Sequence, residues 1–188
     1  MNVGIDNEPR RHRLTVDDYH RMAEVGLLPP DARVELIEGE IIDMAPIGSE
    51  HGAIVDWLAE HLIPAAKSTA IVRVQGAIRL GTRSEPEPDI AVLKRRPDRY
   101  AKSQPSANDV LLVIEVSDTT LRHDLEKKGP LYAHHGIPEY WVIDIPARRV
   151  HVFRAPWDGA FAETSVVERG VLQVPVLGIE LEVASLLV

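Results

Sequence analysis

The chain has 188 residues, enough for one domain with a substantial core and short for two. Its 21 Lys and Arg side chains against 29 Asp and Glu give a net charge of −8, which disfavours a protein that coats nucleic acid through charge alone but allows a local basic patch. It has no cysteine, so disulfides and thiolate metal sites are excluded.

The chain begins with the polar, charged stretch MNVGIDNEPRRHR, which does not have the pattern of a signal peptide. We expect residues 1–13 to be a flexible segment and residues 14–188 to form a single domain. No stretch approaches the ~20 apolar residues of a membrane span. A cytoplasmic protein that is not inserted in a membrane is therefore expected.

Helices and strands alternate in the first half of the chain. Thr15 followed three residues later by Asp18 predicts a capping box at the start of a short helix, which the stretch LLPPDA ends. The stretch RVELIEGEIIDMAP predicts two strands joined around Glu38-Gly39. Ser49 is expected to cap a second helix, and AIVRVQGAIRL predicts a strand pair or one bent strand.

The second half continues the alternation. A strand at DIAVL is followed by a polar loop and by the near-continuous apolar run from Val110 to Val116. A third helix is predicted over about residues 121–135, interrupted at Gly129-Pro130. EYWVIDI and VHVFR then predict a hairpin across PARR, and short strands close the chain. This order favours the α/β class, with a mixed central β-sheet flanked by helices.

Two acidic residues lie at positions where burial of a carboxylate costs free energy. Asp89 follows Pro88 at the mouth of the DIAVL strand, and Glu115 lies inside the buried run LLVIEVS. An unpaired carboxylate in such a place is protonated or destabilising, so each needs a cation, a metal or a hydrogen-bond donor. Two hard oxygen ligands from neighbouring strands suit Mg²⁺ or Mn²⁺.

A lysine in the third helix offers one such partner. The apolar stripe of this helix runs through Leu121, Leu125 and Tyr132, and Lys128 falls into the gap in the stripe. Lys127 points about 100° away on a regular helix and is the ordinary solvated one. We therefore expect Lys128 to reach Glu115, although a surface pair with Asp124 at helical spacing is the alternative.

At this point the motifs resemble a known family. Pro88-Asp89 followed by Glu115-Val116-Ser117 resembles the PD-(D/E)XK nuclease signature, with serine in the third position in place of lysine. VELIEGEII, EPDIAV, VIEVSDTTLRHDLEKKGPLY and GIPEYWVID are similar to the putative restriction endonuclease family of small bacterial proteins, from about residue 14 to the end.

The resemblance implies a restriction-endonuclease-like core and metal-dependent cleavage of DNA. It implies that Asp89, Glu115 and the carbonyl of Val116 bind Mg²⁺ or Mn²⁺, and that Lys128 from the following helix replaces the missing lysine. Glu35, on the VELI strand, and His51, which opens the second helix and points inward, are candidate catalytic residues beside them.

The sequence leaves other readings open. Ser117 and the net charge of −8 also fit a catalytically silent relative that binds nucleic acid or protein, and a metal hydrolase of a small phosphorylated substrate is a third class. For His51 a core position and for Glu35 a structural role are alternatives. Glu85 and Glu87 are expected to be solvated acids, and Tyr132 and Trp141 core residues.

Substrate and partner contacts are predicted at two places. The basic stretch KRRPDRYAK, residues 94–102, would grip phosphates, with Tyr100 stacking on a base, or would be only a solvated loop. Because duplex cleavage needs two strand scissions, a homodimer is expected, with the hairpin EYWVIDIPARRVHVFR and the C-terminal strands offering the surface.

Overall fold

The computed structural model describes residues 11–187. Most of the predicted flexible segment, residues 1–10, lies outside the described residues, as does residue 188. Within the described part, Arg13 pairs with Glu40 at 2.6 Å, and Leu14 N donates to Gly39 O. Arg13 and Leu14 are thus held against the hairpin that contains Gly39 and Glu40.

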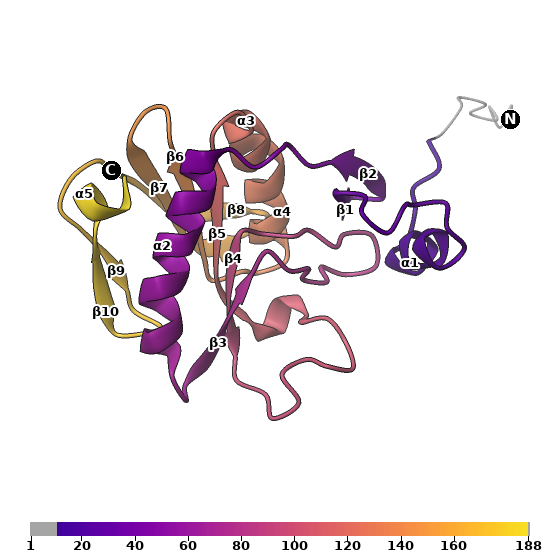
Figure 1. Ribbon diagram of the computed structural model, residues 1–188, viewed down its shortest axis with the longest axis horizontal. Coiled ribbons are helices and arrows are strands. Elements are labelled where there is room, and N and C mark those ends of the chain that lie inside the picture. Colours follow the sequence, from indigo (N-terminus) through magenta and orange to yellow (C-terminus); the bar gives the residue numbers. More distant parts are fainter. Residues whose placement is uncertain (1–10, 188) are drawn as a thin grey trace, which may run out of the picture.

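A six-stranded mixed sheet forms the centre of the domain (Figure 1). Its order is β3-β4-β5-β6-β7-β8, and only β5 and β6 run parallel. The strands are β3 (Ala70–Val74), β4 (Ile90–Lys94), β5 (Val110–Ser117), β6 (Glu139–Asp144), β7 (Arg149–Trp157) and β8 (Ala160–Val167). The predicted α/β class with a mixed central sheet is confirmed, and the parallel pair is joined by the crossover helix that parallel strands require.

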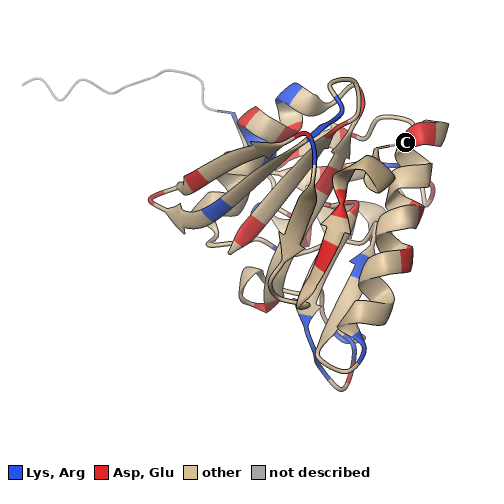
Figure 2. Cartoon of the chain, turned by 90° about the vertical axis from the view of Figure 1, so that its left-hand side faces the viewer, with Lys and Arg blue, Asp and Glu red and all other residues tan. Residues whose placement is uncertain are grey.

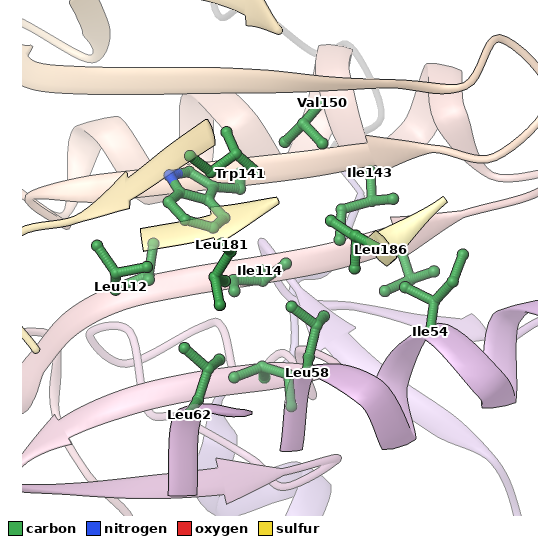
Figure 3. Packing of buried hydrophobic residues seen from close by; sticks show 14 of the residues in the cluster. Ile54, Leu58, Leu62, Leu112, Ile114, Trp141, Ile143, Val150, Leu181 and Leu186 are labelled. Carbon is green, nitrogen blue, oxygen red and sulfur yellow. The ribbon is translucent and has the colours of Figure 1, made fainter. Parts of the chain in front are cut away.

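One face of the sheet packs on α2 (Ser49–Ala66), on the hairpin of β9 (Val171–Val174) and β10 (Ile179–Glu182), and on α5 (Val183–Leu186). Leu58 and Leu62 of α2 meet Ile114 and the fully buried Trp141 there (Figure 3). Successive strand residues point to opposite faces, so alternate apolar residues of β5 and β6 serve this core. The prediction that Ser49 caps α2 is wrong, since Gly48 is the N-cap and Ser49 the first helical residue.

The other face is covered by one continuous helical stretch with an irregular middle. It consists of α3 (Leu121–His123), the π-helical turn η2 (Asp124–Lys128) and α4 (Gly129–His134). Gly129 N donates to Asp124 O, five residues back. Pro130 has no N–H to offer the regular ladder, and a wider turn before it accommodates that loss. The predicted interruption of this helix is thereby confirmed.

The N-terminal elements lie beside the start of β4. The capping box of α1 (Val16–Glu24) is confirmed. β1 (Val34–Ile37) and β2 (Glu40–Asp43) form the predicted hairpin, whose two turn residues, Glu38 and Gly39, both have positive φ. Gly39 must be glycine, because a Cβ there would lie 2.7 Å from Arg13 Cβ. Leu36 and Glu85 then exchange backbone hydrogen bonds, which fix β1 against the segment before β4.

One prediction about the strands needs correction. AIVRVQGAIRL contains one strand that ends at Val74, because Gln75 adopts φ 45° and turns the chain out of the sheet. In the hairpin EYWVIDIPARRVHVFR, β6 is buried throughout and β6 and β7 are paired on both edges, so the surface that it leaves for the expected dimer lies on β7, where several residues are partly exposed. A 3-10 turn, η1 (Ala107–Asp109), precedes β5. No helix among residues 11–187 is long and apolar enough to cross a membrane.

Candidate active site

A pocket of about 930 Å³ opens where β1, the start of β4, the end of β5 and the π-helical turn meet. Glu35, His51, Asp89, Glu115 and Lys128 all line it. These are the five side chains that the sequence singled out, and the fold brings them together from positions 93 residues apart in the chain. Their roles in catalysis remain predictions.

Asp89 is held by donors from three different segments. Its Oδ2 accepts the Val116 backbone N–H at 2.9 Å and lies 3.1 Å from His51 Nε2. Its Oδ1 lies 3.4 Å from Gln75 Nε2, a long hydrogen bond. The Asp89 side chain is 13% exposed, so it faces the pocket without being open to bulk water.

The buried carboxylate of Glu115 on β5 is bound by two donors, Lys128 and Tyr132. Lys128 Nζ lies 3.1 Å from Glu115 Oε1, and the Tyr132 hydroxyl donates to the same oxygen at 2.8 Å. The predicted meeting of Lys128 and Glu115 is confirmed, and Lys127 is exposed as expected. Both donors use Oε1, so within residues 11–187 no hydrogen bond engages Glu115 Oε2.

Glu35 shares the same lysine. Lys128 Nζ lies 3.1 Å from Glu35 Oε2, which also accepts the Glu87 backbone N–H at 3.1 Å. Lys128 therefore sits between two buried carboxylates and does not pair with Asp124 as the alternative had it. Glu85, predicted to be solvated, is buried and lies 2.6 Å from His20 Nε2, because the bridge to β1 draws this segment inward.

Negative charge outweighs positive charge around Lys128. Burial raises the pKa of Glu115 well above its usual value; the Lys128 ammonium opposes the shift, and nearby carboxylates increase it. For Lys128, burial acts to lower the pKa, but the negative charges of Glu115 and Glu35 outweigh burial and the pKa lies above its usual value. The pKa of Glu115 is raised mainly by burial, whereas the pKa of Lys128 is raised by the negative charges of Glu115 and Glu35. A further cation would be favoured here.

The donor set suits a hard divalent ion with an incomplete protein shell. Among residues 11–187, no three His, Cys, Asp or Glu side chains converge closely enough to hold a metal on their own. Mg²⁺ is usually bound through one or two carboxylates, with water and substrate phosphate completing the shell. Asp89, Glu115 with its free Oε2, and the excess negative charge fit that pattern.

Three site residues escaped sequence reasoning. Gln75 lies in an irregular segment just after β3, where no periodicity points to Asp89. Tyr132 was assigned to the core, and its ring is indeed buried, but its hydroxyl binds Glu115. Asp124 is buried and accepts hydrogen bonds from Ser117 and Thr120 at 2.7 Å each. The only signal for Asp124 was its spacing of four residues from Lys128.

The basic stretch of residues 94–102 lies far from this pocket. β4 runs from Ile90 beside Asp89 to Lys94 at the loop, about 13 Å of strand. In Figure 1 this loop lies at the lower end of the sheet, opposite α3 and the start of α2, and Figure 2 shows basic segments at that lower tip. Tyr100 cannot stack on a base, because it is 5% exposed and its hydroxyl donates to Lys94 O at 2.6 Å.

The arginines of the loop have mostly structural partners. Arg96 pairs with Asp98 at 2.7 Å and lies over the Tyr100 ring, 4.4 Å from its centroid. Arg95 donates to the carbonyl groups of Lys67 and Ala70. Of the three arginines in this loop, Arg99 alone is exposed and makes no such side-chain contact within residues 11–187. The loop is therefore better described as a solvated end of the sheet than as a substrate grip.

Comparison with known proteins identifies the family and the fold. No curated protein is significantly similar to the chain. Among solved structures, one described as a "putative nuclease belonging to DUF820" from Anabaena variabilis ATCC 29413 has the same fold, with a TM-score of 0.72 and 22% identity over 93% of this chain and 97% of the other. Residues 16–185 match the Uma2 family, described as "Putative restriction endonuclease". The chain therefore belongs to the Uma2 family.

Proposed function

We propose that the protein is a metal-dependent endonuclease that hydrolyses phosphodiester bonds of DNA. The observation that supports this most is the buried arrangement in which Lys128 lies 3.1 Å from both Glu115 and Glu35, beside Asp89 in one pocket. Membership of a restriction endonuclease family is consistent with nucleic acid as the class of substrate. Ser117 at the usual lysine position does not argue for a silent relative, because Lys128 supplies an ammonium to Glu115.

The residues that would hold Mg²⁺ or Mn²⁺ are Asp89 and Glu115, assisted by the carbonyl of Val116. A divalent ion held there would supply polarisation of the scissile phosphate and a lower pKa for the attacking water. In the hydrolysis, the oxygen of that water would form a bond to phosphorus and the bond from phosphorus to one sugar oxygen would break. The attacking water would give up one proton to solvent, and the leaving sugar oxygen would take one up from solvent.

The chain's own groups prepare the site for this reaction. Lys128 brings a fixed positive charge to the place where negative charge develops on the phosphate. Tyr132 holds Glu115, while His51 and the Val116 amide hold Asp89. A preorganised set of this kind loses no free energy to reorientation during the reaction.

Phosphate contacts outside the reacting group need positive charge near the pocket. Arg33 and Arg122 line the pocket and are exposed, so they are better placed for this than the loop of residues 94–102. Arg122 also pairs with Glu126 at 2.9 Å, an exposed ion pair that contributes little and is readily exchanged for a phosphate.

The test is incubation of purified protein with supercoiled, linear and single-stranded DNA and with a small phosphodiester, in Mg²⁺ and in Mn²⁺. The proposal predicts metal-dependent DNA cleavage that Asp89→Asn abolishes. Cleavage of the small ester alone would favour a hydrolase of small substrates. Binding of the ion or of DNA without any cleavage would instead indicate a silent binding module.

A further inference from the structure

A buried polar cluster ties the end of β5 to the helix that carries Lys128. The hydroxyls of Ser117 and Thr120 each donate to Asp124 Oδ2 at 2.7 Å. Ser117 is fully buried and Asp124 is 4% exposed. Ser117 is the last residue of β5, two positions after Glu115, and Thr120 directly precedes α3.

The backbone of Asp124 is fixed as well. Its carbonyl accepts the Tyr140 hydroxyl at 3.0 Å from β6 and the Gly129 N–H across the π-helical turn. Asp124 is thus held at its carboxylate by the end of β5 and at its carbonyl by the neighbouring strand. It is the first residue of the turn whose last residue is Lys128.

The shape of this turn decides where Lys128 points. A π-helical turn holds one more residue than an α-helical turn, so it shifts the residues after it by about 100° around the helix axis. π-helical turns of this kind are rare and occur often at functional sites. Collapse to a regular helix would rotate Lys128 relative to α3 and so disturb its present contacts, in which both carboxylates lie 3.1 Å from its ammonium.

We propose that Asp124, bound by Ser117 and Thr120, is a positioning residue that maintains the π-helical turn and thereby aims Lys128 at Glu115 and Glu35. The proposal rests on the endonuclease function proposed above. The proposal also gives Ser117 a role. Ser117 occupies the strand position at which the PD-(D/E)XK signature has lysine, and here it anchors the helix that carries Lys128.

The main comparison is between Asp124→Ala and Asp124→Asn. Asparagine keeps a side-chain oxygen that accepts both hydroxyl groups, whereas alanine keeps none. We expect Asp124→Ala to lower kcat for DNA cleavage at least about tenfold, since small misplacements of a reacting group are costly, while KM for DNA stays within about twofold. Asp124→Asn is expected to stay within about threefold of the wild type on the same grounds.

Ser117→Ala combined with Asp124→Ala tests whether the two residues act together. Since both changes break the same contact, the double variant should be no slower than Asp124→Ala alone. Asp109→Ala is the matched control, because Asp109 accepts the Ser106 hydroxyl at 2.7 Å before the far end of β5. Its kcat should equal that of the wild type.

A readout that needs no cleavage separates this proposal from the proposed function. The Lys128 side chain is 6% exposed and its ammonium contacts two buried carboxylates, so the ammonium protons should exchange slowly enough for an NMR signal, assigned by its loss in Lys128→Arg. We expect that signal to persist in Asp124→Asn and to shift or disappear in Asp124→Ala. If the wild type cleaves no DNA, the proposed function fails, while this spectrum still decides whether Asp124 places Lys128.

Several results would overturn the proposal. The first is a kcat and a Lys128 signal in Asp124→Ala that equal those of the wild type. The second is a loss of kcat in Asp124→Asn as large as that in Asp124→Ala, which would indicate that the charge of Asp124 matters and not its position. The third is a loss of kcat of the same size in the control Asp109→Ala. If Asp124→Ala does not fold, Ser117→Ala and Thr120→Val each remove one hydroxyl. Each should lower kcat by about threefold or more, and wild-type kcat in both would contradict the proposal.

Discussion

Replacement of Lys128 by methionine tests whether this ammonium has the proposed catalytic role in addition to its structural one. The Lys128 side chain is 6% exposed, and the two carboxylates that it contacts, Glu35 and Glu115, are 4% and 5% exposed. Methionine has a similar length and leaves no large cavity. The perturbation is therefore the loss of one positive charge between two buried negative charges.

The expected cost in stability follows from those contacts. Removing one partner of a buried ion pair destabilises a protein by about 3–5 kcal/mol, and Lys128 serves two partners, which places Lys128→Met near the upper end. A domain of this kind is stable by about 5–15 kcal/mol, so the variant keeps its fold when the wild type is stable by more than about 5 kcal/mol. Urea denaturation at 15 °C measures the difference, and Lys127→Met should change the free energy of unfolding by less than about 0.5 kcal/mol.

The expected cost in activity is separate. Removing one preorganised donor from a reacting oxyanion lowers kcat by about 10²–10³-fold, so plasmid cleavage by Lys128→Met should be close to undetectable, whereas Lys127→Met stays within about threefold of the wild type. Addition of Glu35→Gln to Lys128→Met removes one of the uncompensated carboxylates. The double variant should recover part of the stability and none of the activity.

Two results would refute this reasoning. Wild-type cleavage by folded Lys128→Met would show that the ammonium has no part in the reaction. A similar loss of activity in Lys127→Met and Lys128→Met would indicate general damage to the helix and not the loss of one specific charge.

Three further predictions concern metal binding, DNA binding and self-association. Gln75→Ala should weaken Mn²⁺ binding by up to about tenfold in calorimetry, because residues that orient a ligand contribute to affinity, and an unchanged affinity would show that the 3.4 Å contact with Asp89 is incidental. Arg95→Ala combined with Arg99→Ala should leave DNA binding within about twofold in fluorescence anisotropy, since the loop lies at the far end of β4, whereas a marked loss would return the loop to the substrate path. Light scattering after size exclusion at micromolar concentration should give the mass of a dimer, and a monomer would contradict the expected self-association.

The sequence predicted the centre of the site because burial makes strict demands. Glu115 in an apolar strand needed a cation, and the helical stripe offered Lys128 for it. That stripe was nevertheless drawn for a regular helix. In the structure Leu125 is only half-buried while Asp124 is buried, because the π-helical turn changes which side chains face the sheet.

Contacts between irregular segments were harder to predict. Gln75 reaches Asp89 because Gln75 itself, directly after β3, has a left-handed backbone conformation. Glu85 is buried because it forms a bridge with Leu36 of β1, 49 positions earlier in the chain. Neither leaves a periodic pattern. The basic stretch around Tyr100 misled for the opposite reason: its composition suits phosphate binding, but its ring and two of its arginines are used within the fold.

The most direct test of the account is a time course of supercoiled plasmid cleavage in Mg²⁺ by the wild type, Asp89→Asn and Glu115→Gln, each confirmed as folded by its melting temperature. The proposed reaction predicts nicked and then linear DNA with the wild type, no product when EDTA is added, and a loss of at least about 10²-fold with either variant, because each variant removes the charge of one proposed metal ligand. Cleavage that persists in both variants, or that survives EDTA, would contradict it.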